Sequence, residues 1–268
     1  MKNRIITAII CMISLSLILF SCSNKTQTTS PVSTIENEDK TEEIKPSYED
    51  QIEIIAQKAD EWFGIYVNTN YSYCVTDLDE NGRLEIISSG IGGSGQFSFG
   101  NIYEVNSTFD GLDKCGENGS FHPDITLKDE IFCRIDPETG KIYYEVYDNM
   151  RLGYGMYGVF NYALTLENGK YELIHISFLD VDTDLDGIEY VTRKYHDDTD
   201  LTEEEYDAAY DTYFKGFDKK TVTLGWQKTE NLENFILQED GNYVYHKLPE
   251  KEELIANLTD SYNKFGIK

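Results

Sequence analysis

The chain has 268 residues, with 49 acidic and 23 basic side chains, and its formal net charge at pH 7 is −26. A negative field of this size repels nucleic acid and anionic lipid, and it favours solubility and the accumulation of cations around the protein. Nucleic-acid binding is therefore excluded from the functions considered below.

The N-terminal segment has the pattern of an export signal. Lys2 and Arg4 precede an apolar run over residues 5–20, which has the length of a signal-peptide core and is short for a membrane-spanning helix. The run ends in LFSC at residues 19–22, which resembles the lipobox of bacterial lipoproteins. The alternative is an ordinary secretory signal in which Cys22 stands by chance.

The lipobox resemblance implies a location. In that family the signal peptide, here residues 1–21, is removed, and the new N-terminal cysteine, here Cys22, carries diacylglycerol and often a further acyl chain. Two or three acyl chains give stable anchoring, whereas one gives only marginal membrane binding. We therefore expect the protein on the outer face of the bacterial cell membrane, attached through a lipid anchor at Cys22.

Residues 22–46 and 47–268 are predicted to have different roles. The first stretch is rich in Ser, Thr, Asn, Glu and Lys and has almost no apolar periodicity. Such a segment cannot bury enough surface to offset its ordering entropy, so the sequence predicts a flexible tether behind the lipidated cysteine. The second stretch is predicted to form a single α+β globular domain.

The first part of this domain is predicted to be a helix followed by a β-rich region. Ser47, with Asp50 three residues later, gives a helix-start signal, and apolar residues follow at near-helical spacing over residues 48–65. From 71 to 195, runs of Tyr, Ile, Val and Phe alternate with turn clusters. The short connections favour an antiparallel β-meander over parallel crossovers.

Helical patterns return towards the C-terminus. Thr202 and Glu205 form a capping box before an apolar face that ends at Gly216. A last helix is predicted from near Pro249 to Gly266, with proline in its first turn and glycine just past its end. The expected fold is a meander sheet flanked by N-terminal and C-terminal helices.

The best candidate site lies in the sequence DLDENGRLE at residues 77–85. Calcium takes six to eight oxygen ligands, and alternate positions of a tight loop can aim such oxygens inward. Gly82, at position 6 of the loop, permits a sharp backbone turn. The candidate calcium ligands are Asp77, Asp79, Asn81, the Arg83 carbonyl and Glu85.

This loop resembles the DxDxDG-type loops between strands in integrin-like and other extracellular β-repeat modules, and the resemblance implies a calcium site. It is not an EF-hand, because position 12 is Ser88 and the flanking sequence indicates strands. The alternative is a hairpin turn in which the Asp and Asn side chains cap their own backbone.

A second acidic stretch, DVDTDLDGIE at residues 180–189, gives a weaker metal candidate. Asp182, Asp184 and Asp186 are its possible ligands, and Gly187 takes the same position as Gly82 in the first loop. Position 9 is Tyr190, so a carboxylate is missing there. A solvated acidic turn is the favoured interpretation.

The cysteines leave two alternatives open. Once the signal is removed and Cys22 acylated, Cys74, Cys115 and Cys133 remain, and this odd number allows at most one disulfide. Cys115 and Cys133 form the pair to test. Buried free cysteines acting as small apolar residues are the other interpretation.

The lipobox, the stretch YCVTDLDENGRLEII and the stretch LTEEEYDAAYDTYFKGF together resemble surface lipoproteins of Gram-positive bacteria. That resemblance implies location and architecture, and no activity. We expect a non-enzymatic calcium-binding module that binds an extracellular ligand or protein partner. The alternative is a cell-envelope hydrolase whose carboxylates are assembled only by the fold. A solute-binding component of an importer is disfavoured, because no two-lobed repeat is visible, and no residue is assigned as catalytic.

Overall fold

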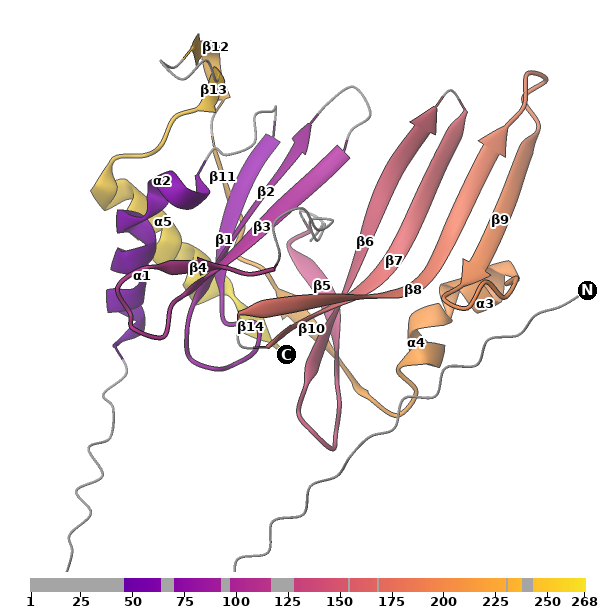
Figure 1. Cartoon of the computed structure of the whole chain (residues 1–268), viewed down its shortest axis with the longest axis horizontal. Coiled ribbons are helices and arrows are strands. Elements are labelled where there is room, and N and C mark those ends of the chain that lie inside the picture. Colours follow the sequence, from indigo (N-terminus) through magenta and orange to yellow (C-terminus); the bar gives the residue numbers. More distant parts are fainter. Residues whose placement is uncertain are drawn as a thin grey trace, which may run out of the picture. The chain divides into compact units, whose positions relative to one another are not determined.

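The computed structural model describes residues 46–63, 70–92, 97–116, 128–153, 155–167, 169–229, 231–237 and 243–268. The predicted signal peptide, Cys22 and the predicted tether up to residue 45 lie outside the described residues. The described chain is α+β with antiparallel sheets, and this confirms the predicted fold class (Figure 1).

The helices of the described chain lie in its first and last thirds, where the sequence predicted them. They are α1 (Tyr48–Gln57), α2 (Ala59–Trp62), α3 (Glu203–Asp207), α4 (Ala209–Tyr213) and α5 (Lys251–Lys264). The helix-start signal predicted at Ser47 and the capping box predicted at Thr202 are both confirmed, and Ser47 also forms a capping box with Asp50. The helix expected over 48–65 is interrupted at Lys58, where φ is −101° and ψ is 21°.

The strands form two larger sheets and a separate hairpin, where the sequence predicted one meander. The first sheet has the order β11 (Gln227–Lys228), β1 (Asn70–Thr76), β2 (Glu85–Gly92), β3 (Phe97–Val105) and β4 (Leu112–Lys114). The second has the order β14 (Gly266–Ile267), β10 (Asp218–Thr223), β5 (Glu130–Ile135), β6 (Ile142–Gly153), β7 (Met156–Glu167), β8 (Lys170–Thr183) and β9 (Glu189–Tyr195). The hairpin pairs β12 (Asn231–Leu237) with β13 (Tyr243–His246).

Hydrophobic side chains join these elements in layers. Alternate residues of β1 illustrate the pattern: Tyr73 and Val75 pack with α1 and α5, whereas Cys74 packs with the second sheet. The first sheet is therefore buried on both faces, and its strands carry buried polar residues such as Glu85 and Glu104 as well as apolar ones. On the far side of the second sheet, Ala209 and Phe214 pack against Ala163 and Ile176.

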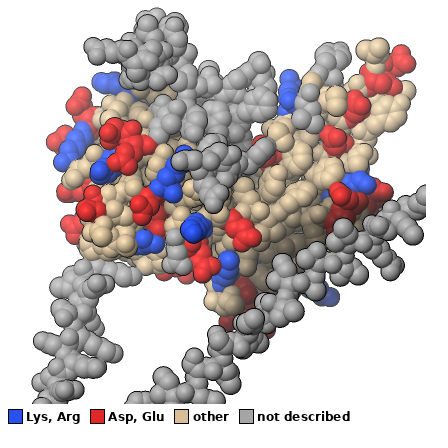
Figure 2. Space-filling model, in the orientation of Figure 1, with Lys and Arg blue, Asp and Glu red and all other residues tan. Residues whose placement is uncertain are grey.

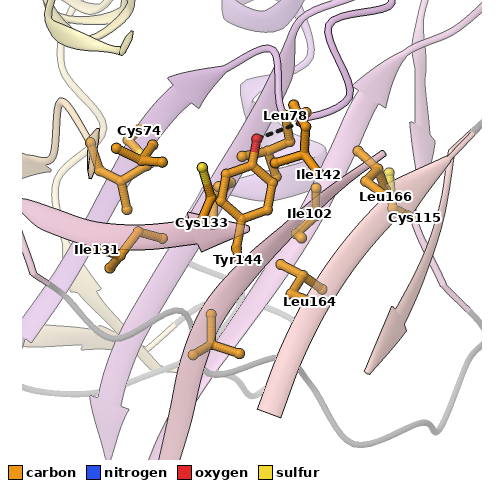
Figure 3. Packing of buried hydrophobic residues seen from close by; sticks show 14 residues of the cluster. Cys74, Leu78, Ile102, Cys115, Ile131, Cys133, Ile142, Tyr144, Leu164 and Leu166 are labelled. Carbon is orange, nitrogen blue, oxygen red and sulfur yellow. Dashed lines mark hydrogen bonds between the residues drawn. The ribbon is translucent and has the colours of Figure 1, made fainter. Parts of the chain in front are cut away.

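The core between the two sheets contains all three described cysteines (Figure 3). Cys74, Cys115 and Cys133 are buried and free, so the structure favours the interpretation as small apolar residues. Tyr144 crosses this core and donates its hydroxyl to the Leu78 carbonyl at 2.5 Å. That hydrogen bond links the second sheet to the loop between β1 and β2.

Charge on the described surface is unevenly placed. On the face shown in Figure 2, acidic side chains gather over the helices and at the tip of the β8–β9 hairpin. No helix in the described ranges combines the length and the apolar character needed to span a lipid bilayer.

Candidate metal centre in the β1–β2 loop

The predicted calcium loop connects β1 to β2 and is anchored in both cores. Leu78 belongs to the core between the sheets and Leu84 to the core under the helices, and they are 2% and 0% exposed. Because these two leucines point into different cores, they hold the loop and the acidic residues on it and next to it at a fixed place. Gly82 has φ of 80°, the left-handed conformation that the sequence predicted for it.

The loop brings three of the predicted ligands together. One carboxylate oxygen from each of Asp77, Asp79 and Glu85 lies within 4.8 Å of the others, and this is the only such acidic group within the described part of the chain. Oxygens on opposite sides of a bound Ca²⁺ are separated by about twice the 2.3–2.6 Å ligand distance. This buried acidic cluster could therefore hold a metal ion.

Glu85 is the most constrained member of the cluster. Its side chain is fully buried, and its Oε2 accepts hydrogen bonds from the Leu78 backbone N–H at 2.7 Å and the Thr76 hydroxyl at 3.0 Å. Its other oxygen, Oε1, has no hydrogen-bond partner within the described structure. A buried carboxylate oxygen without a donor is costly, and a cation at the cluster would remove that cost.

Burial also changes the acidity of the cluster. Desolvation raises the pKa of Asp77 from 3.8 to about 6, although the Gly82 backbone N–H, which donates to its Oδ1 at 3.3 Å, opposes the rise. Desolvation raises the pKa of Glu85 well above its ordinary range, and the charges of Asp77 and Asp79 add to the effect. No described Lys or Arg forms an ion pair with any of the three carboxylates. The cluster is therefore short of positive charge.

Asn81 holds the loop together in a way that differs from a simple ligand. Its Nδ2 donates to Asp79 at 3.0 Å and to Glu104 at 2.7 Å, and its Oδ1 accepts from the Arg83 backbone N–H at 2.7 Å. Its side chain thus bridges two carboxylates. The role predicted for the Arg83 carbonyl as a ligand stays a prediction, and the Arg83 guanidinium pairs with Glu104 at 2.7 Å.

Glu104 and Gln51 are the neighbours that sequence reasoning missed. Glu104 lies opposite Glu85 in the β2–β3 register and is 1% exposed. Gln51, from α1, is also 1% exposed, and it donates from Nε2 to the Gly82 carbonyl at 3.0 Å and accepts at Oε1 from the Leu84 N–H at 2.9 Å. The only available signal for Gln51 was a polar residue next to the apolar stripe of the helix.

Replacement of Gln51 by leucine is expected to lower the free energy of unfolding by about 2–4 kcal/mol, because two buried backbone groups of the loop lose their partners. Chemical denaturation measures the loss. Gln227→Leu is the matched control, since the Gln227 side chain makes an exposed hydrogen bond to Asp260. Equal effects of the two substitutions would contradict the role assigned to Gln51.

The second acidic stretch forms a solvent-exposed turn at the β8–β9 connection. Asp184 Oδ1 accepts from the backbone N–H groups of Asp186 and Ile188, both at 2.9 Å, and Gly187 has φ of 81°. Asp182, Asp184 and Asp186 are not brought together as the first three carboxylates are. The arrangement is that of an aspartate capping its own turn.

Comparison of the chain with protein-family models, with curated proteins and with solved structures finds no match.

Proposed function

We propose that the protein is a membrane-anchored extracytoplasmic lipoprotein whose globular domain binds calcium in the β1–β2 loop and presents a non-enzymatic binding surface. The observation that carries the proposal is the cluster of Asp77, Asp79 and Glu85, which contains a fully buried carboxylate with an unpartnered oxygen. Like charges at this separation repel strongly when buried. A divalent cation both neutralises them and supplies a partner for the free oxygen.

Calcium is favoured over other metals by the donor set. All three clustered side chains offer oxygen, which is the donor type preferred by hard cations. Magnesium requires near-ideal octahedral geometry at 2.0–2.1 Å, whereas calcium accepts irregular shells with longer bonds. A loop whose carboxylates are already fixed by Thr76, Gly82 and Asn81 suits the more tolerant ion.

A structural role for the metal is favoured over a catalytic one. Asp77, Asp79 and Glu85 each accept a hydrogen bond from the loop or from the strand next to it. The cluster therefore sits at the point where the loop closes. A cation there would stiffen the junction between the α1 layer and the two sheets, where Gln51 and Tyr144 also contact the loop.

Calorimetric titration of detergent-solubilised full-length protein tests the metal proposal. We expect one calcium ion to bind per chain, with much weaker binding of magnesium. Asp77→Asn combined with Asp79→Asn should abolish binding, whereas Asp182→Asn combined with Asp184→Asn should leave it unchanged. If calcium binding survives the first pair of substitutions and disappears with the second, the ion binds in the β8–β9 turn. That result would refute the calcium site proposed in the β1–β2 loop.

Metabolic labelling with a palmitate analogue tests the anchor. Labelled protein is expected in the membrane fraction, and Cys22→Ser should abolish the label, because the acylated sulfur is then missing. Cys11→Ser serves as the control, since that cysteine lies within the segment expected to be removed. Unlabelled wild-type protein in the culture medium would instead indicate an ordinary secretory signal.

A further inference from the structure

One member of the proposed calcium cluster, Asp79, lines a groove. The groove has a volume of about 550 Å³, and Asn81, Thr139, Lys141 and Tyr143 also line it. This volume lies in the range of sites for small molecules. The groove therefore connects the outer members of the metal loop with the turn between β5 and β6.

The metal site needs ligands from this side. Calcium takes six to eight oxygens, and three carboxylates provide at most six, of which one Glu85 oxygen already accepts two hydrogen bonds. Asn81 uses its side-chain oxygen to accept from the Arg83 N–H. Since Asp79 is the cluster member that lines the groove, free coordination positions of the ion would face the groove.

The charge balance selects the class of ligand. Three carboxylates carry three negative charges and Ca²⁺ carries two positive charges, so the loaded cluster keeps one negative charge. Asp136 and Glu167 add further carboxylates to the groove. A second anion would be repelled, whereas a hydroxyl group can bind the ion through a lone pair and donate its proton to a carboxylate.

Other groups in the groove complement a polyhydroxylated molecule. The Lys141 ammonium is 3.5 Å from Glu167, a loose ion pair whose side chains are 32% and 68% exposed. It can donate to a ligand oxygen without leaving a buried charge unpaired. Ile142 and Leu166, which are 7% and 4% exposed, add a small apolar surface to the same groove, and this suits contact with a C–H group of a sugar ring.

We propose that this groove binds a carbohydrate, with two neighbouring hydroxyl groups of the sugar completing the calcium shell. The inference rests on the proposed calcium site. A second hollow of about 390 Å³ shares Lys141 and Glu167 with the groove and extends to Lys170 and Tyr171. A ligand of more than one sugar unit would therefore place Lys141 between two adjacent units.

Saturation-transfer NMR on detergent-solubilised full-length protein tests the proposal, with glucose, galactose, mannose and N-acetylglucosamine as probes and glucuronate as the charged comparison. At least one neutral sugar is expected to bind in calcium and to be released by EGTA. By linkage, the bound sugar must raise the affinity of the protein for calcium by the same factor by which calcium raises the affinity of the protein for the sugar.

Variants separate the possible results. Lys141→Met should weaken sugar binding about tenfold, the loss of one charge-assisted hydrogen bond, and leave calcium binding in the absence of sugar unchanged. Lys128→Met is the control, because Lys128 lies over the Tyr147 ring in a different hollow. Three results, each with normal calcium binding, would overturn the carbohydrate proposal. The first is that no sugar binds, and the second is that sugar binding is unchanged by EGTA or by Lys141→Met. The third is that only glucuronate binds. Absence of calcium binding without any sugar would overturn the metal site itself, and the carbohydrate proposal with it.

Discussion

In the absence of calcium, the Asp77 carboxyl is expected to destabilise the folded protein at pH 7, and this contribution should fade as the pH is lowered to about 4. The pKa of this carboxyl is about 6 in the folded protein and 3.8 ordinarily. Between these two values the folded state still binds a proton that the unfolded state has released, so stability falls as pH rises. Above pH 6 the full cost remains, and a shift of this size corresponds to about 3 kcal/mol.

Asp77→Asn isolates this contribution. The amide keeps an oxygen to accept from the Gly82 N–H and carries no charge, so the variant should be more stable than the wild type at pH 7 in EGTA. The difference should approach zero near pH 4. Thermal unfolding at a series of pH values measures both curves, and Asp184→Asn is the control, since Asp184 lies in the exposed turn and its pKa is lowered by backbone N–H groups. Parallel curves for the wild type and Asp77→Asn would contradict the assignment.

Calcium should reverse this pattern. Because the ion competes with protons for the same oxygens, its stabilising effect is expected to be largest above pH 6 and to fade below it. An excess of calcium one hundred times its dissociation constant would add about 2.7 kcal/mol. Asp77→Asn, which is expected to be more stable than the wild type in EGTA, should therefore be stabilised less by calcium than the wild type is.

Replacement of Gly225 by alanine is expected to destabilise the fold by about 3 kcal/mol, at the upper end for overpacking. A Cβ at this position would lie 2.1 Å from the Ser261 carbonyl oxygen and 2.8 Å from its carbon. These are backbone atoms of α5, so no side chain can swing away. Ser261 is fully buried, and its hydroxyl accepts from the Val75 N–H at 2.8 Å, so a displaced helix would also lose its contact with β1.

Denaturant midpoints measure this effect, and Gly266→Ala is the matched control. An added Cβ at Gly266 meets no atom within 4 Å, so its substitution should change the free energy of unfolding by only a few tenths of a kcal/mol. Similar midpoints for the two variants would show that α5 does not approach Gly225 as closely as described here.

Features that depend on near neighbours in the chain were predictable. The capping boxes at Ser47 and Thr202 each need only residues three apart, and both are present. The antiparallel pairing of β7 with β8 across a short turn agrees with the antiparallel arrangement predicted from short connections. The positions of Asp77, Asp79 and Glu85 on one side of the loop also followed from their spacing, because Gly82 takes the expected conformation.

Features set by distant parts of the chain were not predictable. The division into two sheets depends on β10 pairing with β5 and on β11 pairing with β1, each across a long stretch of sequence. The hydrogen bond from Asn81 to Glu104 depends on the β2–β3 register, which places Glu104 opposite Glu85. The role of Asn81 as a calcium ligand stays a prediction, and nothing in the sequence indicated that its amide donates to both Asp79 and Glu104.

The last residues of the described chain complete both sheets, and this has a consequence for how the protein is made. β14 pairs with β10 at the edge of the second sheet, while Leu254 and Leu258 of α5 cover the first sheet. The packing of α5 and the pairing of the edge strand β14 are therefore complete only after residues 251–267 have been synthesised, and contacts between distant parts of a chain form late in folding. If the proposed export as a lipoprotein is right, late folding of this kind would favour translocation of the unfolded polypeptide.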